Sequence, residues 1–246
     1  MDLSSPSIQL GILISELLLL YIIGRRITNR LYGLFFLFFR NQHIAFTLLA
    51  ALTLPGTILH EISHLLVAEL LRVQTGAISF EPKMEKLPNG KQHLTYGSLM
   101  IGKSDPLRRY TIGFAPIFGG LSILTGLITL FHYLLPFATT FYIKAGLVSL
   151  FCYLIFTISI TMFSSREDLS GFAAFGLSLG VLGTLAYSAG LRINLTGHIL
   201  VAATTSLNQL VWVLGIVLGI DLIFFLVSQA LLLMLQKVFK VVLRVE

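Results

Sequence analysis

Long apolar stretches are the feature of this sequence that most restricts its fold. A helix needs about 20 consecutive apolar residues to cross the hydrocarbon core of a bilayer. About six stretches qualify, at roughly 7–24, 44–71, 110–135, 142–163, 169–190 and 207–236. With 56% of the residues hydrophobic and only 11% charged, the composition is far from that of a water-soluble domain. We therefore expect an all-α polytopic membrane protein with about six transmembrane helices, forming a single membrane domain over 1–246.

Basic residues are scattered through the connecting segments and give the chain a formal charge of +6. They form no continuous basic groove, so nucleic acid is excluded as a partner and the lipid bilayer is the expected one. Most of them follow the second, fourth and sixth stretches, which predicts that both termini are cytosolic. Arg25 and Arg26, directly after the first stretch, favour the opposite orientation.

The longest polar segment, residues 72–109, contains a predicted β-hairpin. The tripeptide Pro88-Asn89-Gly90 separates AISFE from KQHLTYGSLMI, and Asn-Gly between extended runs is a strong hairpin signal. We expect a short membrane-associated hairpin between the second and third transmembrane helices. It is either an ordinary connecting ribbon or an edge strand to which an unwound substrate adds by main-chain hydrogen bonds. The Phe-rich segment 31–40 is too short to cross the bilayer and is expected at its interface.

Polar residues interrupt the second apolar stretch in the sequence ILHEISHLLVAEL, residues 58–70. His60 and His64 are four residues apart and so share one face of a helix, with Glu61 next to them. An acid at the bilayer centre opposes insertion by about 2.5 kcal/mol or more. His-Glu-x-x-His on a helix is the spacing of a zinc site with its general base. The alternative is a packed histidine pair with a glutamate turned towards a polar cavity.

A zinc ion bound by these two histidines would make this a hydrolytic site. Two neutral imidazoles bind the ion, and Glu61 acts as general base on a water whose pKa zinc lowers to about 7. Catalytic zinc sites usually have three protein ligands. Asp168, at the end of the fourth stretch, is the first candidate for the third ligand and its neighbour Glu167 the second. Asp221 and His198 come after these.

These features together resemble the site-2 protease family of intramembrane zinc metalloproteases. The resemblance covers about 44–171, which would be the catalytic core: the HEISH helix, the hairpin-bearing loop, GFAPIFGG in the third stretch, and Asp168. It implies that His60, His64 and Asp168 bind zinc and that Glu61 is the catalytic residue. It also implies cleavage of transmembrane or membrane-tethered protein or peptide substrates near the cytosolic face.

The third stretch departs from the pattern of that family. Where the family usually has Gly-Pro-x-x-Asn, this chain has Ala115-Pro116-Ile117-Phe118-Gly119. By resemblance, Pro116, Gly119 and Gly120 become candidate substrate-binding residues. From the residues alone, glycines in an apolar helix more often indicate close helix packing.

Three other functions remain open on the sequence. A non-catalytic membrane-binding relative would keep zinc for structure, but it would have no use for Glu61 as a base. An integral zinc protease of another type would share only the HEISH motif and take a glutamate as its third ligand. A small proton-coupled transporter would use Glu16 and Asp221, which leaves the HEISH motif unexplained.

Overall fold

The computed structural model describes residues 6–80, 83–86, 92–95, 97–102, 104–163, 180–186, 188–190 and 197–239. Over these residues the chain has five helices that are long and apolar enough to cross a membrane. They are α1 (Pro6–Phe39), α2 (Gln42–Leu70), α3 (Pro106–Leu134), α4 (Phe141–Thr161) and α6 (Gly197–Phe239). A short 3-10 helix, η1 (Leu135–Phe137), joins α3 to α4. The predicted helical membrane architecture is confirmed, whereas the predicted span at 169–190 lies mostly outside the described residues.

Helix α1 continues through a region where the sequence suggested two separate segments. The expected span at 7–24 and the expected interfacial segment at 31–40 form one helix of 34 residues. After Pro6 no proline interrupts it, and each internal glycine lowers helix stability by only about 1 kcal/mol. At 1.5 Å per residue the helix is about 51 Å long, against about 30 Å of hydrocarbon. A helix of this length that crosses a bilayer must tilt or extend past the hydrocarbon core.

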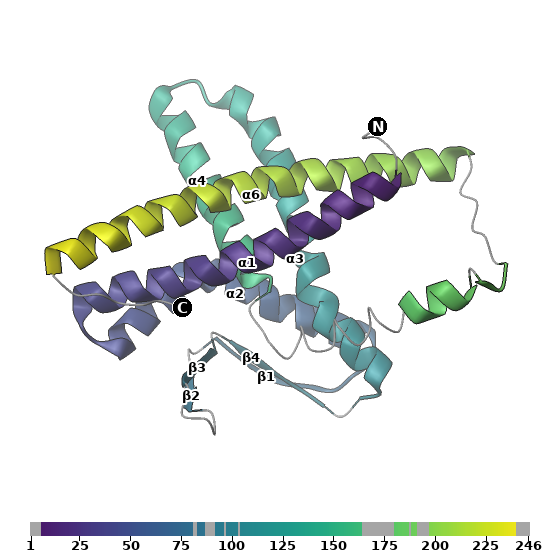
Figure 1. Cartoon of the computed structure of the whole chain (residues 1–246), viewed down its shortest axis with the longest axis horizontal. Helices are drawn as coiled ribbons and strands as arrows, with labels where there is room; N and C mark the ends of the chain where they lie inside the picture. Colours follow the sequence, from purple (N-terminus) through teal and green to yellow (C-terminus); the bar gives the residue numbers. More distant parts are fainter. Residues whose placement is uncertain are drawn as a thin grey trace.

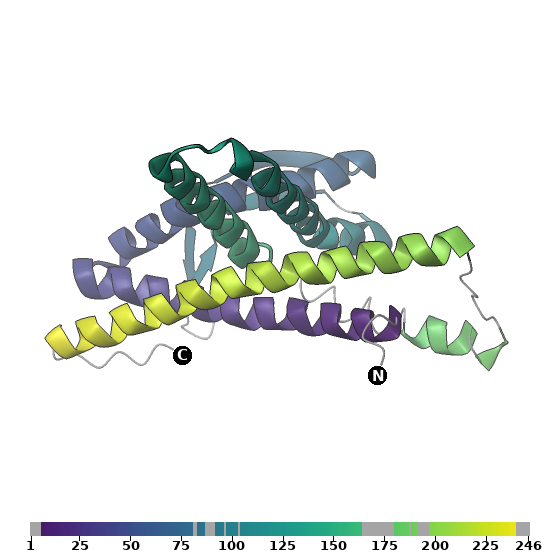
Figure 2. The ribbon, with the colours of Figure 1, turned by 90° about the horizontal axis from the view of Figure 1, so that it is seen from above.

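Helices α1 and α6 lie side by side and run in the same direction (Figures 1 and 2). Leu20 of α1 belongs to the same buried cluster as Leu214 of α6. Ten residues further along α1, the Arg30 guanidinium lies over the ring of Phe225, 3.8 Å from its centroid. Later residues of α1 thus contact later residues of α6, and the first and last described helices form a long parallel pair.

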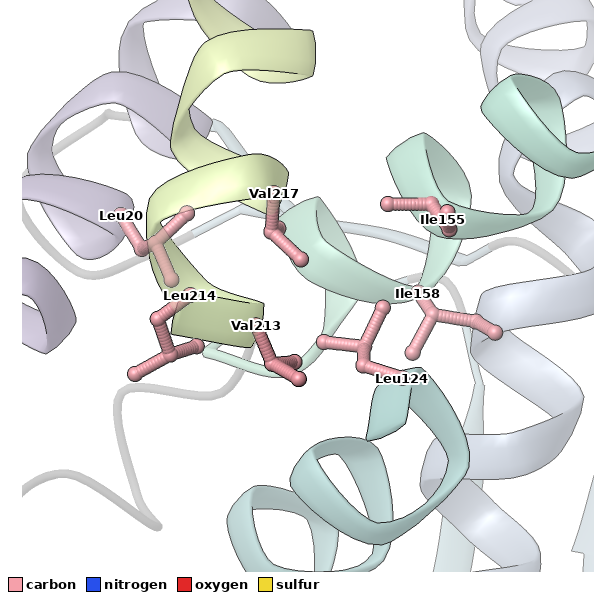
Figure 3. Packing of buried hydrophobic residues seen from close by; sticks show 7 residues of the cluster. All are labelled: Leu20, Leu124, Ile155, Ile158, Val213, Leu214 and Val217. Atoms are coloured by element: carbon pink, nitrogen blue, oxygen red, sulfur yellow. The ribbon is translucent and has the colours of Figure 1, made fainter. Parts of the chain in front are cut away.

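The main buried cluster lies where this pair crosses the hairpin of α3 and α4 (Figures 1 and 3). Four helices contribute its members: Leu20 from α1, Leu124 from α3, Ile155 and Ile158 from α4, and Val213, Leu214 and Val217 from α6. Lipid tails are as apolar as these side chains, so close packing rather than exclusion of water holds such helices together in a bilayer. The cluster fixes one face of α4 and leaves another face for α2.

A β-ribbon connects α2 to α3 and consists of two antiparallel strand pairs. The strand β1 (Thr75–Ser79) pairs with β4 (Ser98–Ile101), and β2 (Lys83–Lys86) pairs with β3 (Gln92–Thr95). The antiparallel pairing on both sides of residues 88–90 confirms the predicted hairpin, although its turn lies outside the described residues. Both β1 and β4 contact α2, which brings the ribbon to the histidine motif.

Candidate metal and active site

Helix α2 carries the histidine motif and remains one helix of 29 residues despite an internal proline. It begins after Asn41, whose side chain accepts hydrogen bonds from two backbone N–H groups of the first turn. Pro55 has no N–H to donate, and its ring crowds the preceding turn. Tyr153 of α4 donates a hydrogen bond of 3.0 Å to the carbonyl of Leu52. Helix α4 therefore supplies a polar partner to the turn that the proline disturbs.

Gly56 sets the closest approach of α2 to α4. A Cβ atom at this position would lie under 3.0 Å from the Thr157 carbonyl group and from Thr161 Oγ1. Both threonine hydroxyls donate to carbonyls of their own helix, at 3.1 Å for Thr157 and 2.8 Å for Thr161. A small residue at a helix crossing lets the two backbones approach in this way. The turn immediately before His60 is therefore fixed against α4.

His60 and His64 direct their Nε2 atoms towards each other. The two atoms are 3.2 Å apart, and the rings are nearly perpendicular, with an interplanar angle of 82°. Two imidazole nitrogens bound at 2.0–2.1 Å to one tetrahedral zinc ion would be separated by about 3.3 Å. The observed separation is that of two nitrogens sharing one zinc ion and also that of a direct hydrogen bond between the two rings.

His64 is oriented through its other ring nitrogen. Its Nδ1 lies 2.8 Å from the carbonyl oxygen of Ile112 in α3. A carbonyl can only accept, so Nδ1 carries the proton and Nε2 of the neutral ring presents its lone pair to His60. Metal-binding histidines usually donate their second ring N–H to such a partner. Without a metal, the same lone pair would accept a hydrogen bond from His60.

The end of α2 holds the Ile112 carbonyl group in place. The backbone N–H of Val73 bonds back to Ala68 at 2.9 Å, and that of Arg72 bonds back to Glu69 at 3.0 Å. Arg72 adopts a φ of 56°, and this pattern of bonds is a Schellman ending. Val73 then packs on Ala68 and Ile112 in a small buried cluster.

Glu61 is buried beside the histidines, and the β-ribbon closes over it. The exposed fraction of its side chain and backbone together is 6%, compared with 6% for His60 and 5% for His64. Gly97, just before β4, approaches so closely that a Cβ atom there would lie 2.8 Å from Glu61 Oε1 and 3.1 Å from Thr57 Cγ2. The sequence did not point to Gly97, because nothing local indicates which residue of the ribbon meets α2.

The predicted substrate-binding residues of α3 contact the neighbouring helices. A Cβ atom on Gly119 would collide with Ser63 Oγ of α2, between the two histidines. A Cβ atom on Gly120 would lie 2.6 Å from Met162 Sδ, directly after α4. Pro116 and Gly120 are buried. The two glycines let α3 pack against both α2 and α4, and a role in substrate binding stays a prediction.

The described part of the chain places no candidate for the third zinc ligand beside the histidines. Asp168 and Glu167 lie outside the described residues. Among the residues that are described, no three His, Cys, Asp or Glu side chains are arranged to hold a metal ion. The structure therefore brings together His60 and His64 with Glu61 adjacent, and the third ligand stays a prediction.

The two more remote candidates lie elsewhere. Asp221 is hydrogen-bonded to Ser159, which is about 200° round α4 from Thr157. Because Thr157 faces Gly56 of α2, Asp221 lies on the opposite side of α4 from the histidine motif. His198 is exposed in the first turn of α6.

Comparison with protein-family models, with curated proteins and with solved structures finds no match to this chain. The functional interpretation therefore depends on the geometry around His60, Glu61 and His64.

Proposed function

We propose that this protein is an intramembrane zinc metalloprotease that cleaves membrane-spanning or membrane-tethered substrates. The observation that carries the proposal is the 3.2 Å separation of His60 Nε2 and His64 Nε2, on a membrane-spanning helix and next to a buried glutamate. The two histidines would hold the ion together with a carboxylate from the segment after α4, Asp168 first and Glu167 second. Bound zinc would lower the pKa of a water to about 7 and polarise the substrate carbonyl.

Glu61 supplies the base for this reaction. It follows His60 directly, about 100° round the helix, so its carboxylate can reach a water that lies beside the histidine nitrogens. The carboxylate would take a proton from that water and return it to the leaving amine. Burial of Glu61 keeps this exchange away from bulk solvent, where charge interactions are weaker.

The β-ribbon supplies a docking edge for an extended substrate. A peptide bond in a helix is covered by its own turns, so a substrate helix must unwind before its carbonyl can be attacked. Among the described strands, β4 pairs with β1 alone, which leaves its other edge for a peptide strand. Because Gly97 lies against Glu61, a peptide aligned on β4 would pass close to the base.

The test compares Glu61→Gln with Glu69→Gln in the full-length protein. Glu69 is on the same helix but accepts a hydrogen bond from Thr75 Oγ1 at 2.9 Å on an exposed part of the surface. We expect the wild-type protein to hold about one zinc per chain and to cut a model transmembrane peptide. Glu61→Gln should keep the zinc and lose cleavage, whereas Glu69→Gln should keep both.

Each outcome separates the proposal from its alternatives. Cleavage that survives in Glu61→Gln would remove the mechanism. Zinc in both proteins without cleavage by either would indicate a non-catalytic protein with a structural metal. Zinc content after Asp168→Ala and after Glu167→Ala identifies the third ligand, and retention in the first with loss in the second favours an integral zinc protease of another type.

A further inference from the structure

A second buried polar group lies across α4 from the histidines. Asp221 of α6 has an exposed fraction of 0%, and its Oδ1 is 2.9 Å from Ser159 Oγ of α4. Leu214 and Val217, on the preceding turns of α6, are also fully buried, so the carboxyl group sits in the apolar seam of the helix packing. A carboxyl group in a membrane-spanning helix is a candidate for function.

The hydrogen bonds of Ser159 indicate that the Asp221 carboxyl group carries a proton. Ser159 Oγ is 2.9 Å from Asp221 Oδ1 and also 2.9 Å from the carbonyl oxygen of Phe156. A serine hydroxyl has one hydrogen, so it can make a full hydrogen bond as donor to only one of these acceptors or share a weaker one between both. Each of the two contacts has its own hydrogen when the carboxyl group itself is protonated. Asp221 then donates to Ser159 Oγ, and Ser159 donates to Phe156.

The charges near Asp221 do not favour an ionised carboxylate. Its Oδ2 is buried and has no hydrogen-bond partner among the described residues. In that part of the chain no basic side chain forms an ion pair with it: Arg30 of α1 lies over the ring of Phe225. The nearest acid on α1 is Glu16, beside Gly215, and its charge would be of the same sign. A buried anion without a cation or a full set of donors is strongly disfavoured.

We propose that Asp221 is an intramembrane proton-binding site whose bound proton ties α6 to α4 through Ser159. Helix α4 ends at Thr161, two residues beyond Ser159, so this link fixes the end of α4 that precedes Asp168. The proposal concerns a side of α4 that does not contact the histidine motif. A proton on Asp221 does not depend on whether the histidines bind zinc.

Infrared spectroscopy of the full-length protein in lipid at neutral pH tests the proposal. A protonated carboxyl group has a C=O stretching band that is separate from the carboxylate bands. We expect Asp221→Asn to lose one such band and Glu16→Gln to keep it. Ser159→Ala should shift this band because the carboxyl group loses its acceptor. Ser122→Ala is the matched control and should leave the band unchanged, since Ser122 donates only to Phe118 of its own helix, at 2.8 Å.

If Asp221→Asn loses carboxylate bands and keeps every band of a protonated carboxyl group, Asp221 is ionised. An unshifted band in Ser159→Ala would mean that the proton does not tie α6 to α4. If Asp221→Asn fails to fold, aspartate is labelled with carbon-13 in the wild-type chain and in Ser159→Ala. The chain has four aspartates, and Asp105 is ion-paired with Arg108 at 3.2 Å, so the protonated band that shifts in Ser159→Ala is the one that belongs to Asp221. Absence of any isotope-shifted protonated band would then refute the assignment.

Discussion

Replacing Gly56 with alanine should separate the histidine helix from α4. The added Cβ atom would lie 2.6 Å from the carbonyl carbon of Thr157, whereas ordinary contact begins at 3.4 Å. The shortfall is about 0.8 Å, and the obstructing group is backbone, so no side-chain rotation can relieve it. Helices α2 and α4 must therefore move apart.

Two opposing terms set the size of this effect. Overpacking of a closely packed interior destabilises a protein by about 1–3 kcal/mol. Alanine is a better helix former than glycine by about 1 kcal/mol, which offsets part of this. Because the obstructing group is backbone, the upper part of the overpacking range applies, about 2–3 kcal/mol. The net loss is then about 1–2 kcal/mol, equivalent to a factor of about 5–30 in the ratio of folded to unfolded protein. Because His60 is one turn away, zinc affinity should fall as well.

Thermal unfolding and zinc titration of the purified protein measure both effects. Gly146→Ala is the matched control, because it adds the same methyl group to α4 at a position with nothing within 4 Å. The control should be as stable as the wild type or slightly more stable. Adding Thr161→Ala to Gly56→Ala should not restore stability, since the Thr157 carbonyl group remains in the way. Equal stability and equal zinc affinity for Gly56→Ala and Gly146→Ala would refute the argument from backbone contact.

Three further substitutions test neighbouring contacts. Gly97→Ala places a methyl group 2.8 Å from Glu61 Oε1, so cleavage should fall by about tenfold or more, or about 1.4 kcal/mol in the barrier, while zinc content stays constant; loss of zinc would point to a general distortion instead. Gly120→Ala meets the flexible Met162 side chain, so its Tm should fall less than that of Gly56→Ala. Adding Gly120→Ala to Met162→Ala should lower the Tm less than adding it to the wild type, and an equal fall in both backgrounds would contradict this. Tyr153→Phe removes the donor to the Leu52 carbonyl and should lower the free energy of unfolding by about 1 kcal/mol, with an unchanged Tm counting against the role of this bond.

Local periodicity predicted the parts of the candidate site that lie on one helix. The spacing of His60 and His64 places both rings on one face of any α-helix, and the surrounding apolar residues predict that helix. The hairpin was also predictable, because Asn89-Gly90 lies between two extended runs. In both cases the interacting residues are close in the sequence.

Contacts between distant segments could not be predicted in the same way. His64 bonds to the backbone carbonyl of Ile112, which is 48 positions away, and a backbone acceptor has no residue-type signature. Gly97 meets Glu61 because the ribbon folds back onto α2, and the sequence alone does not fix that angle. The expected span ended at residue 24 because about 20 residues are enough to cross a bilayer. No helix-breaking residue lies there, so α1 continues.

The parallel pairing of α1 with α6 has a consequence for the two ends of the chain. Helices that cross a bilayer in succession point alternately towards one side and the other. If the five described spans are the crossings, the first and fifth point the same way, as α1 and α6 do. A chain threaded in this manner places the start of α1 on one side of the lipid and the end of α6 on the other, in contrast to the arrangement that the distribution of basic residues predicted. Reporter proteins fused to each end would then respond to opposite compartments.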